Sequence, residues 1–148
     1  MRREGPLLAR EASSGELEEW LELLFAQHSS VWSARESSMS AEARSFCRAI
    51  VASGQRDGWL RFSMLQWQGR PAAFEIGLVR GHGYVSYLGS RDRSLERYSP
   101  GAVLQAHMVK AAREAGARRW DFGLGEEAYK LRDASGVAEV ANWFLYPA

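Results

Sequence analysis

The spacing of apolar residues changes from a helical period to a strand period near the middle of the chain. Apolar side chains recur every three or four positions from residue 17 to residue 51, and this spacing predicts amphipathic helices. From Gly58 to Leu88 they alternate with more polar residues, and two glycine-containing turns divide this stretch into three runs. The pattern therefore predicts two helices followed by an antiparallel meander of three strands.

Capping signals give the expected ends of the two helices. Ser13 and Glu16 have the spacing of a capping box, and the first helix is expected to continue towards His28. The second helix is expected to begin near Ser40 and to stop at Ser53–Gly54, because glycine readily adopts the left-handed conformation that ends many helices.

The second half of the chain alternates strand, helix and strand. A helix with one apolar face is expected from Pro100 to Gly116, and a short strand follows from Arg119 to Phe122. A glycine-bounded acidic loop leads to an expected last strand from Val140 to Tyr146. The predicted order is two helices, three strands, helix, strand, loop and strand, which indicates an α/β (α+β) fold.

Length and composition limit the classes of function. The 148 residues suit a single domain over residues 1–148, with residues 1–12 as a lead-in or an edge strand. Nineteen Lys and Arg residues against 18 Asp and Glu residues leave no broad charged surface, so we expect no nucleic-acid or membrane partner. The chain lacks the roughly 18 consecutive apolar residues of a membrane span and the apolar run of a secretory signal, which predicts a cytoplasmic protein. The single Cys47 and the scattered histidines predict no metal site.

The start of the third helix has the composition of an anion-binding site. Ser99, Pro100 and Gly101 follow a strand and a loop, and a helix N-terminus offers unpaired backbone N–H groups and the positive end of the helix dipole. Pro100 suits the first turn because its missing N–H is not needed there, and Gly101 leaves the backbone open to a ligand. The same residues also suit an ordinary helix start, and the pattern alone leaves both interpretations open.

A longer stretch of the chain resembles a known family. The segment YSPGAVLQAHMVKAAREAGARRWDFGLGEEAYKLR, from Tyr98 to Arg132, resembles the C-terminal region of the CelD/BcsL-like acetyltransferases. That family belongs to the GNAT superfamily of acyl-CoA-dependent N-acyltransferases and is similar to the FemAB aminoacyl transferases. His28 with Trp32 matches the H-x-x-R-W element of the family, and Gly69–Phe74 matches its hairpin. The chain departs from the family pattern at Val31, Glu36 and Asp133.

The resemblance implies a GNAT-like fold with a mixed, mostly antiparallel central sheet flanked by helices. Family members usually carry two GNAT-like halves, and this chain resembles the second half. A lone half leaves sheet edges open, and open edges tend to pair. We therefore expect a homodimer or a piece of a longer protein.

The resemblance also assigns acyl-CoA to a place in the fold. It implies that the pantetheine arm lies between the strands Tyr84–Leu88 and Arg119–Phe122, and that the pyrophosphate binds at the start of the third helix. The cofactor-binding residues implied in this way are Tyr98, Ser99, Pro100 and Gly101, assisted by Arg93 or Arg97.

Three residues near the end of this segment are candidates for catalysis. Asp121, in a short apolar strand, is either a general base for the amine or a group that orients the acceptor. It also suits a structural anion paired with Arg118, Arg119 or backbone donors. Tyr129 suits protonation of the leaving thiolate, and Lys130 suits binding of a phosphate or of a developing oxyanion, although both residues also suit an exposed loop. The residues expected to contact the acceptor are His28, Trp32 and Glu126.

Three functions are consistent with the sequence. The first is an acyl-CoA-dependent N-acyltransferase that uses acetyl-CoA and acts on an amine of a small molecule, a sugar or a cell-envelope precursor. The second is a FemAB-like aminoacyl transferase, which the near-neutral charge disfavours because its donor would be a large RNA. The third is a non-catalytic dimerisation or ligand-binding module, which the departures from the family pattern support.

Overall fold

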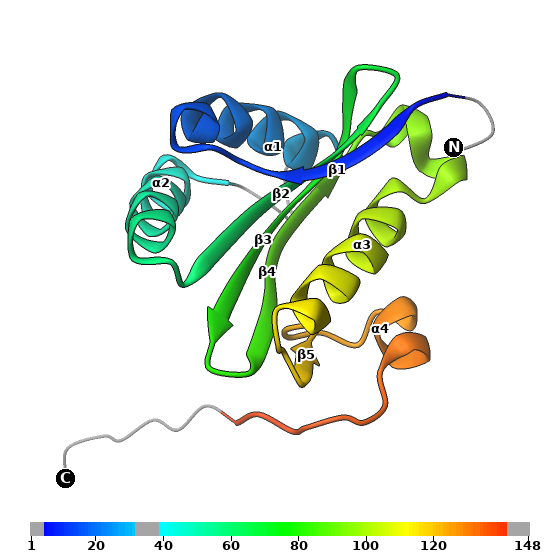
Figure 1. Ribbon diagram of the computed structural model, residues 1–148. Coiled ribbons are helices and arrows are strands. Elements are labelled where there is room, and N and C mark those ends of the chain that lie inside the picture. The colour runs from blue at the N-terminus through cyan, green and yellow to red at the C-terminus, as the bar shows by residue number, and fades with distance from the viewer. Residues whose placement is uncertain (1–4, 32–38, 142–148) are drawn as a thin grey trace, which may run out of the picture.

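A five-stranded sheet forms the centre of the computed structural model, which describes residues 5–31 and 39–141. Helices α1 and α2 cover one face of this sheet, and α3 covers the other (Figure 1). The strands are β1 (Leu7–Glu11), β2 (Leu60–Trp67), β3 (Arg70–Arg80), β4 (Gly83–Arg91) and β5 (Arg119–Asp121). The helices are α1 (Leu17–Val31), α2 (Ala41–Asp57), α3 (Pro100–Glu114) and α4 (Ala128–Asp133), with 3₁₀ turns η1 (Ser14–Glu16) and η2 (Arg93–Tyr98).

The sheet is mixed and mostly antiparallel, as expected. Its strand order is β1-β2-β3-β4-β5, and the antiparallel meander of β2, β3 and β4 is confirmed. The strand β5 pairs in parallel with β4, but only from Gly83 to Val85 of that strand. Just beyond, Ile76 of β3 pairs with Leu88 whereas Gly77 pairs with Ser86, so β4 contains one extra residue. This bulge bends β4, and past it the two strands no longer pair.

The expected start of α1 is confirmed, whereas the expected end of α2 is wrong. The capping box of Ser13 and Glu16 is present, and α1 follows one turn later. Helix α2 continues past Gly54, which is buried within the helix. A Cβ at this position would lie 2.5 Å from the Cβ of Leu60. The helix ends instead at Gly58, whose φ of 76° is left-handed. Gly54 therefore serves close packing of α2 on β2, which the local pattern cannot distinguish from a helix end.

Other differences lie near the two ends of the described chain. Of the residues expected as a lead-in or an edge strand, Leu7–Glu11 form an edge strand, because β1 pairs with β2. Helix α4 lies in the segment that the sequence pattern left as a loop. Residues 142–146 of the expected strand Val140–Tyr146 lie outside the described residues, and Val140 itself belongs to no strand. Within the described parts of the chain, no helix has the length and apolar character needed to cross a membrane.

The sheet separates two apolar layers. On the side of α1 and α2, Trp20 lies edge-on to Phe62 and Phe74 at 5.6 and 5.8 Å between ring centroids. On the other side, Leu104 and Met108 of α3 pack on the sheet. Since successive strand residues point to opposite faces, the apolar neighbours Phe74 and Ile76 point towards α1 and α2, and Glu75 between them points towards α3.

Gly77 makes room for Tyr84, and its replacement tests this packing. A Cβ at Gly77 would lie 1.8 Å from the Tyr84 hydroxyl oxygen, and the Tyr84 ring stacks on Trp120 at 4.0 Å. We expect Gly77→Ala to lower the free energy of unfolding by about 1–3 kcal/mol in urea titrations, because the ring must move. Gly89→Ala is the matched control, since a Cβ there has no neighbour closer than 3.7 Å. Equal losses in the two variants would contradict this account.

Candidate functional site

A cleft with a volume of about 500 Å³ opens where β4 and β5 separate. Its walls come from β3 and β4, from the start of α3, from the end of α1 and from the segment between β5 and α4. The lining residues with polar or reactive groups that bear on its chemistry are Glu75, Ser86, Ser99, Gly101, Tyr129 and Lys130. The divergence of two strands therefore gathers residues that lie more than fifty positions apart in the sequence.

The start of α3 presents backbone amides to this cleft. Ser99 has a left-handed backbone with φ 49°, and the buried Pro100 occupies the first turn. The amide of Val103 donates to the Ser99 carbonyl at 3.1 Å, so the amides before it have no acceptor within the helix. A Cβ added at Gly101 would meet no atom within 4 Å, so the space in front of this turn is open. The arrangement suits a phosphate group.

Glu75 is a buried carboxylate on the cleft wall that the sequence analysis missed. It accepts a hydrogen bond from the Ser86 hydroxyl, and its Oε1 atom has no partner among the described residues. Burial raises the pKa of Glu75 to about 7, and the hydrogen bond from Ser86 opposes this shift only in part. A carboxylate with this pKa exchanges protons near neutral pH, as a general base must. The signal in the sequence was a lone acid inside the apolar run AAFEIGL.

Helix α4 brings Tyr129 and Lys130 to the same cleft. Burial and the nearby Glu127 raise the pKa of Tyr129, so its hydroxyl keeps its proton at neutral pH. The Lys130 Nζ atom lies 2.9 Å from Glu127 Oε2 and also donates to the Leu124 carbonyl. This pairing lowers the pKa of Glu127. Lys130 thereby holds the segment before α4 in place. Its suggested role in binding an anion stays a prediction.

The structure does not bring Asp121 and Glu126 into the cleft lining. The Asp121 Oδ1 atom accepts a hydrogen bond from the Gly123 amide at 2.9 Å, and its Oδ2 atom lies 3.8 Å from Arg119. Glu126 is exposed, and the neighbouring Glu127 lines the cleft instead. The geometry of Asp121 is that of a turn-forming carboxylate, and its suggested role as a general base stays a prediction.

The remaining predicted residues divide between the cleft and its surroundings. Ser99, Gly101 and His28 line the cleft, and burial lowers the pKa of His28. Trp32 lies outside the described residues.

Three predicted cofactor contacts lie next to the cleft rather than in its lining. The Tyr98 ring packs against Trp67 at 5.1 Å. Arg93 donates to the Ser30 carbonyl at the end of α1 at 3.2 Å, and Arg97 donates to the Tyr98 hydroxyl at 2.7 Å. These contacts support the turn before α3, and direct contact with a cofactor stays a prediction for these residues.

Comparison with protein families gives one match that spans most of the chain. Residues 2–131 match the family described as acetyltransferase (GNAT) domain. A search of curated protein sequences finds no significant match. The CelD/BcsL-like subfamily is therefore not established by these comparisons, whereas the broader superfamily is.

Solved structures with the same fold are acetyltransferases at low sequence identity. A GCN5-related N-acetyltransferase from Ralstonia eutropha JMP134 superposes with a TM-score of 0.72 and 15% identity, over 94% of this chain and 99% of that one. An aminoglycoside acetyltransferase from an uncultured soil metagenomic sample, solved with sisomicin, gives 0.68 and 11% identity over 96% and 97%. AAC(6′)-Iy, solved with the bisubstrate analogue CoA-S-monomethyl-acetylneamine, gives 0.62 and 14% identity over 97% and 98%.

Proposed function

Because the chain belongs to the GNAT family of acetyltransferases, we propose that its cleft transfers the acetyl group of acetyl-CoA to a primary amine of a small molecule or sugar. The observation that carries the proposal is the meeting of three features in one cleft. These are the open helix start at Gly101, the buried carboxylate of Glu75 and the hydroxyl of Tyr129. They supply an anion site, a base and an acid, which are the groups that thioester aminolysis uses.

The donor fits the cleft through its pyrophosphate. The amides of the first α3 turn face open space at Gly101, and the helix dipole adds positive potential there. From this turn the cleft continues along β4 and reaches Glu75, the partner of Gly89, before it reaches the bulge. A pantetheine arm placed between β4 and the segment after β5 brings the thioester close to this carboxylate.

The transfer then proceeds by direct attack of the amine on the thioester. Glu75 removes a proton from the acceptor ammonium, and the free amine attacks the thioester carbonyl carbon. A carbon–nitrogen bond forms, and the carbon–sulfur bond breaks as the carbonyl re-forms. The departing thiolate takes the proton of the Tyr129 hydroxyl. The nitrogen loses its second proton as the amide forms, and this proton restores the Tyr129 hydroxyl through water, since Tyr129 is 42% exposed. Glu75 then releases its proton to solvent. Glu75 takes the place that the sequence analysis gave to Asp121.

The groups around Glu75 indicate the class of acceptor. Glu96 lies 3.3 Å from Arg91 and Glu127 lies 2.9 Å from Lys130, so the charges of these lining carboxylates are balanced. Glu75 has no ion-pair partner among the described residues, and an unbalanced carboxylate favours a cationic amine over an anionic acceptor. Two structures with the same fold were solved with sisomicin and with an acetylneamine analogue. We therefore propose an amino sugar or a similar polyhydroxylated amine as the acceptor.

The proposal is tested with the purified chain, acetyl-CoA and a set of amines that includes sisomicin and glucosamine. We expect release of the CoA thiol that depends on the amine, which a thiol-reactive dye detects. We also expect the acetylated amine in the mass spectrum. Binding of acetyl-CoA in calorimetry without thiol release from any amine would instead favour a ligand-binding module. Transfer from aminoacyl-tRNA in the absence of acetyl-CoA would favour the FemAB-like alternative.

A further inference from the structure

The carboxylate of Glu75 is largely closed off from the cleft that it lines. Glu75 is 6% exposed, and its Oε1 atom is buried without a partner among the described residues. An amine held in the cleft therefore has little direct access to the group that is proposed to deprotonate it. Ser86 is half-buried, lines the same cleft and donates its hydroxyl hydrogen to Glu75. We propose that the Ser86 hydroxyl relays a proton from the acceptor ammonium to Glu75, an inference that rests on the transfer reaction proposed above.

The register of β3 and β4 places the serine beside the carboxylate. Ser86 pairs with Gly77, two residues after Glu75 in β3. Ser86 is therefore the diagonal neighbour of Glu75 on the sheet face that α3 covers, and the long Glu75 side chain can reach across to it. The bulge decides which residue takes this position, because without the extra residue of β4 Tyr87 would lie opposite Gly77. The bulge thus brings a small hydroxyl to the carboxylate instead of a bulky ring.

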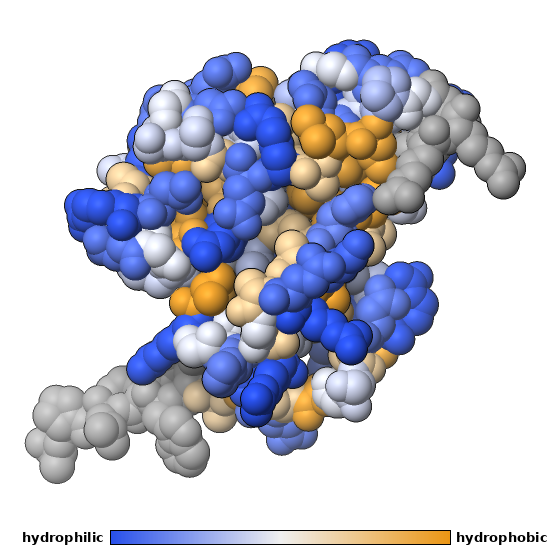
Figure 2. Space-filling view, viewed as in Figure 1, coloured by the Kyte–Doolittle hydropathy of each residue, from blue (hydrophilic) through white to orange (hydrophobic). Residues whose placement is uncertain are grey.

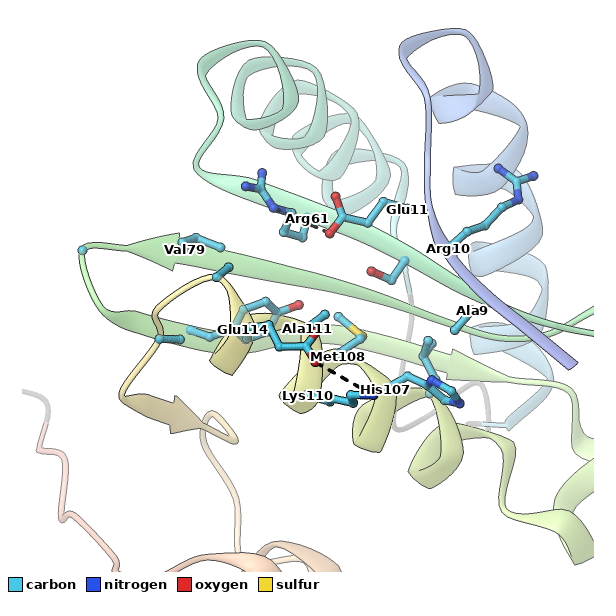
Figure 3. A pocket seen from close by; sticks show the side chains of 17 residues that line it. Ala9, Arg10, Glu11, Arg61, Val79, His107, Met108, Lys110, Ala111 and Glu114 are labelled. Atoms are coloured by element: carbon cyan, nitrogen blue, oxygen red, sulfur yellow. Dashed lines mark ion pairs between the residues drawn. The ribbon is translucent and has the colours of Figure 1, made fainter.

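Glu75 faces the cleft and not the second cavity on this side of the sheet. This cavity, with a volume of about 330 Å³, lies between β1 and the C-terminal half of α3, where Figure 2 shows apolar and weakly polar surface. Glu11 and Glu114 line it, and each lies in an ion pair (Figure 3). Glu75 is not among the described residues that line this cavity. A proton taken from the acceptor therefore reaches Glu75 from the side of the cleft.

The titratable groups nearest to Glu75 on β4 and α4 are engaged elsewhere or keep their protons. Burial and the nearby Glu75 charge raise the pKa of Tyr84, whose hydroxyl is itself buried. The raised pKa of Tyr129 keeps its hydroxyl protonated for the leaving thiolate. Lys130 lies 2.9 Å from Glu127, so its charge is already balanced. These groups do not carry the proton of the acceptor to the carboxylate.

The cleft walls from the other elements add little charge. His28 lines the cleft at the end of α1, and burial lowers its pKa, which favours the neutral imidazole. Arg91 of β4 lies 3.3 Å from Glu96. The lining residues of α3 carry no ionisable side chain. Ser86 thus combines contact with the carboxylate and a place in the cleft wall.

The relay moves two protons in the same direction. The Ser86 hydroxyl passes its hydrogen to the Glu75 carboxylate while its oxygen accepts a proton from the ammonium nitrogen. The amine becomes neutral and attacks the thioester, Ser86 is again a neutral hydroxyl, and Glu75 carries the proton. Because the two transfers are concerted, no serine alkoxide forms. The same path in reverse returns the proton from the buried carboxylate to solvent after the transfer.

Ser86→Ala and Ser86→Thr test the relay, because threonine keeps the hydroxyl and alanine removes it. We expect Ser86→Ala to lower kcat/KM for acetyl transfer by at least about tenfold, compared at an equal fraction of charged Glu75. Ser86→Thr is expected to stay within about threefold of wild type. Acetyl-CoA affinity, measured by calorimetry, is expected to be the same in both variants, since the relay acts on the acceptor.

Nuclear magnetic resonance gives the fraction of charged Glu75 without any turnover. The chain is labelled with ¹³C at the glutamate carboxyl carbons, and Glu75→Gln assigns the resonance of Glu75. The hydrogen bond from Ser86 favours the charged carboxylate, so its loss in Ser86→Ala is expected to raise the pKa of Glu75 above the wild-type value of about 7. Ser86→Thr is expected to keep the wild-type value.

Each contrary result has a separate meaning. An unchanged pKa of Glu75 in Ser86→Ala would show that the hydroxyl does not contact the carboxylate, and would overturn the relay. A wild-type rate in Ser86→Ala at an equal fraction of charged Glu75 would show that Ser86 only adjusts the pKa. A loss in Ser86→Thr as large as that in Ser86→Ala would assign the effect to packing. Absence of transfer to every amine in the wild-type chain would overturn the proposed function and the relay with it.

Discussion

Replacing Glu75 with glutamine is expected to lower kcat/KM for acetyl transfer by at least about 100-fold, because the amine then lacks its general base. The wild-type kcat/KM is expected to fall below about pH 7, where the Glu75 carboxylate takes up a proton. The glutamine variant is expected to lose this limb of the pH profile. Steady-state thiol release between about pH 5.5 and 9 measures both effects.

Two companion measurements make the Glu75 result specific. Acetyl-CoA affinity, measured by calorimetry, is expected to change less than about twofold in Glu75→Gln, since the base acts on the acceptor rather than the pyrophosphate. Asp121→Asn is measured in parallel, because Asp121 is the base that the sequence suggested. A large loss in Asp121→Asn together with a retained rate in Glu75→Gln would reverse the assignment.

The same substitution has an expected effect on stability with a definite sign. The pKa of Glu75 in the folded chain, about 7, lies above the ordinary 4.5, so the unfolded chain loses this proton at lower pH than the folded chain. The cost of Glu75 to stability is therefore absent below about pH 4.5, grows as the pH rises from about 4.5 to about 7, and stays constant above that. At about pH 8 this cost is on the order of 3 kcal/mol. Urea titrations are expected to show that Glu75→Gln gains stability relative to wild type between about pH 5 and pH 8.

Replacing Gly101 with glutamate is expected to weaken acetyl-CoA binding by about 100-fold or more. The new carboxylate would occupy the open space before the first α3 turn, where the pyrophosphate is proposed to bind. Repulsion between like charges at such a contact costs several kcal/mol. Calorimetric titration with acetyl-CoA and with desulfo-CoA measures the loss, and both ligands are expected to be affected equally because they share the pyrophosphate.

Gly101→Gln separates charge from size at the same position. It adds a side chain of the same length without a charge, and we expect a loss of about tenfold or less. Neither substitution is expected to lower the melting temperature, since a Cβ at Gly101 meets no atom within 4 Å and an acid suits the first turn of a helix. Unchanged acetyl-CoA affinity in Gly101→Glu would show that the pyrophosphate binds elsewhere.

The helix start at Gly101 and the proposed base Glu75 differ in how far the sequence could identify them. Ser99, Pro100 and Gly101 are adjacent, and helix-start chemistry depends on neighbouring residues, so the pattern alone offered an anion site. In the sequence, Glu75 is only an acidic residue within an apolar strand, and nothing in the pattern marks it as a base. Its raised pKa comes from the packing of α3 and β4 around it, and no local pattern describes that packing.

What the sequence determined by itself was the set of elements whose signals are local. The capping box at Ser13, the strand period from Leu60 and the glycine turns each depend on residues a few positions apart, and the structure confirms these elements. The resemblance of the Tyr98–Arg132 segment to a GNAT family added the superfamily, which the family comparison confirms.

Only the tertiary structure decided where the cleft opens and which groups face it. The extra residue of β4 appears only when that strand is paired with β3, and the separation from β5 follows from it. The structure also places the Asp121 carboxylate on the amide of Gly123 in its own loop, and it brings Tyr129, on an unexpected helix, to the cleft. Strand pairing and packing bring together residues that are far apart along the chain, and no local periodic pattern indicates these contacts. The contacts form only when the whole domain folds.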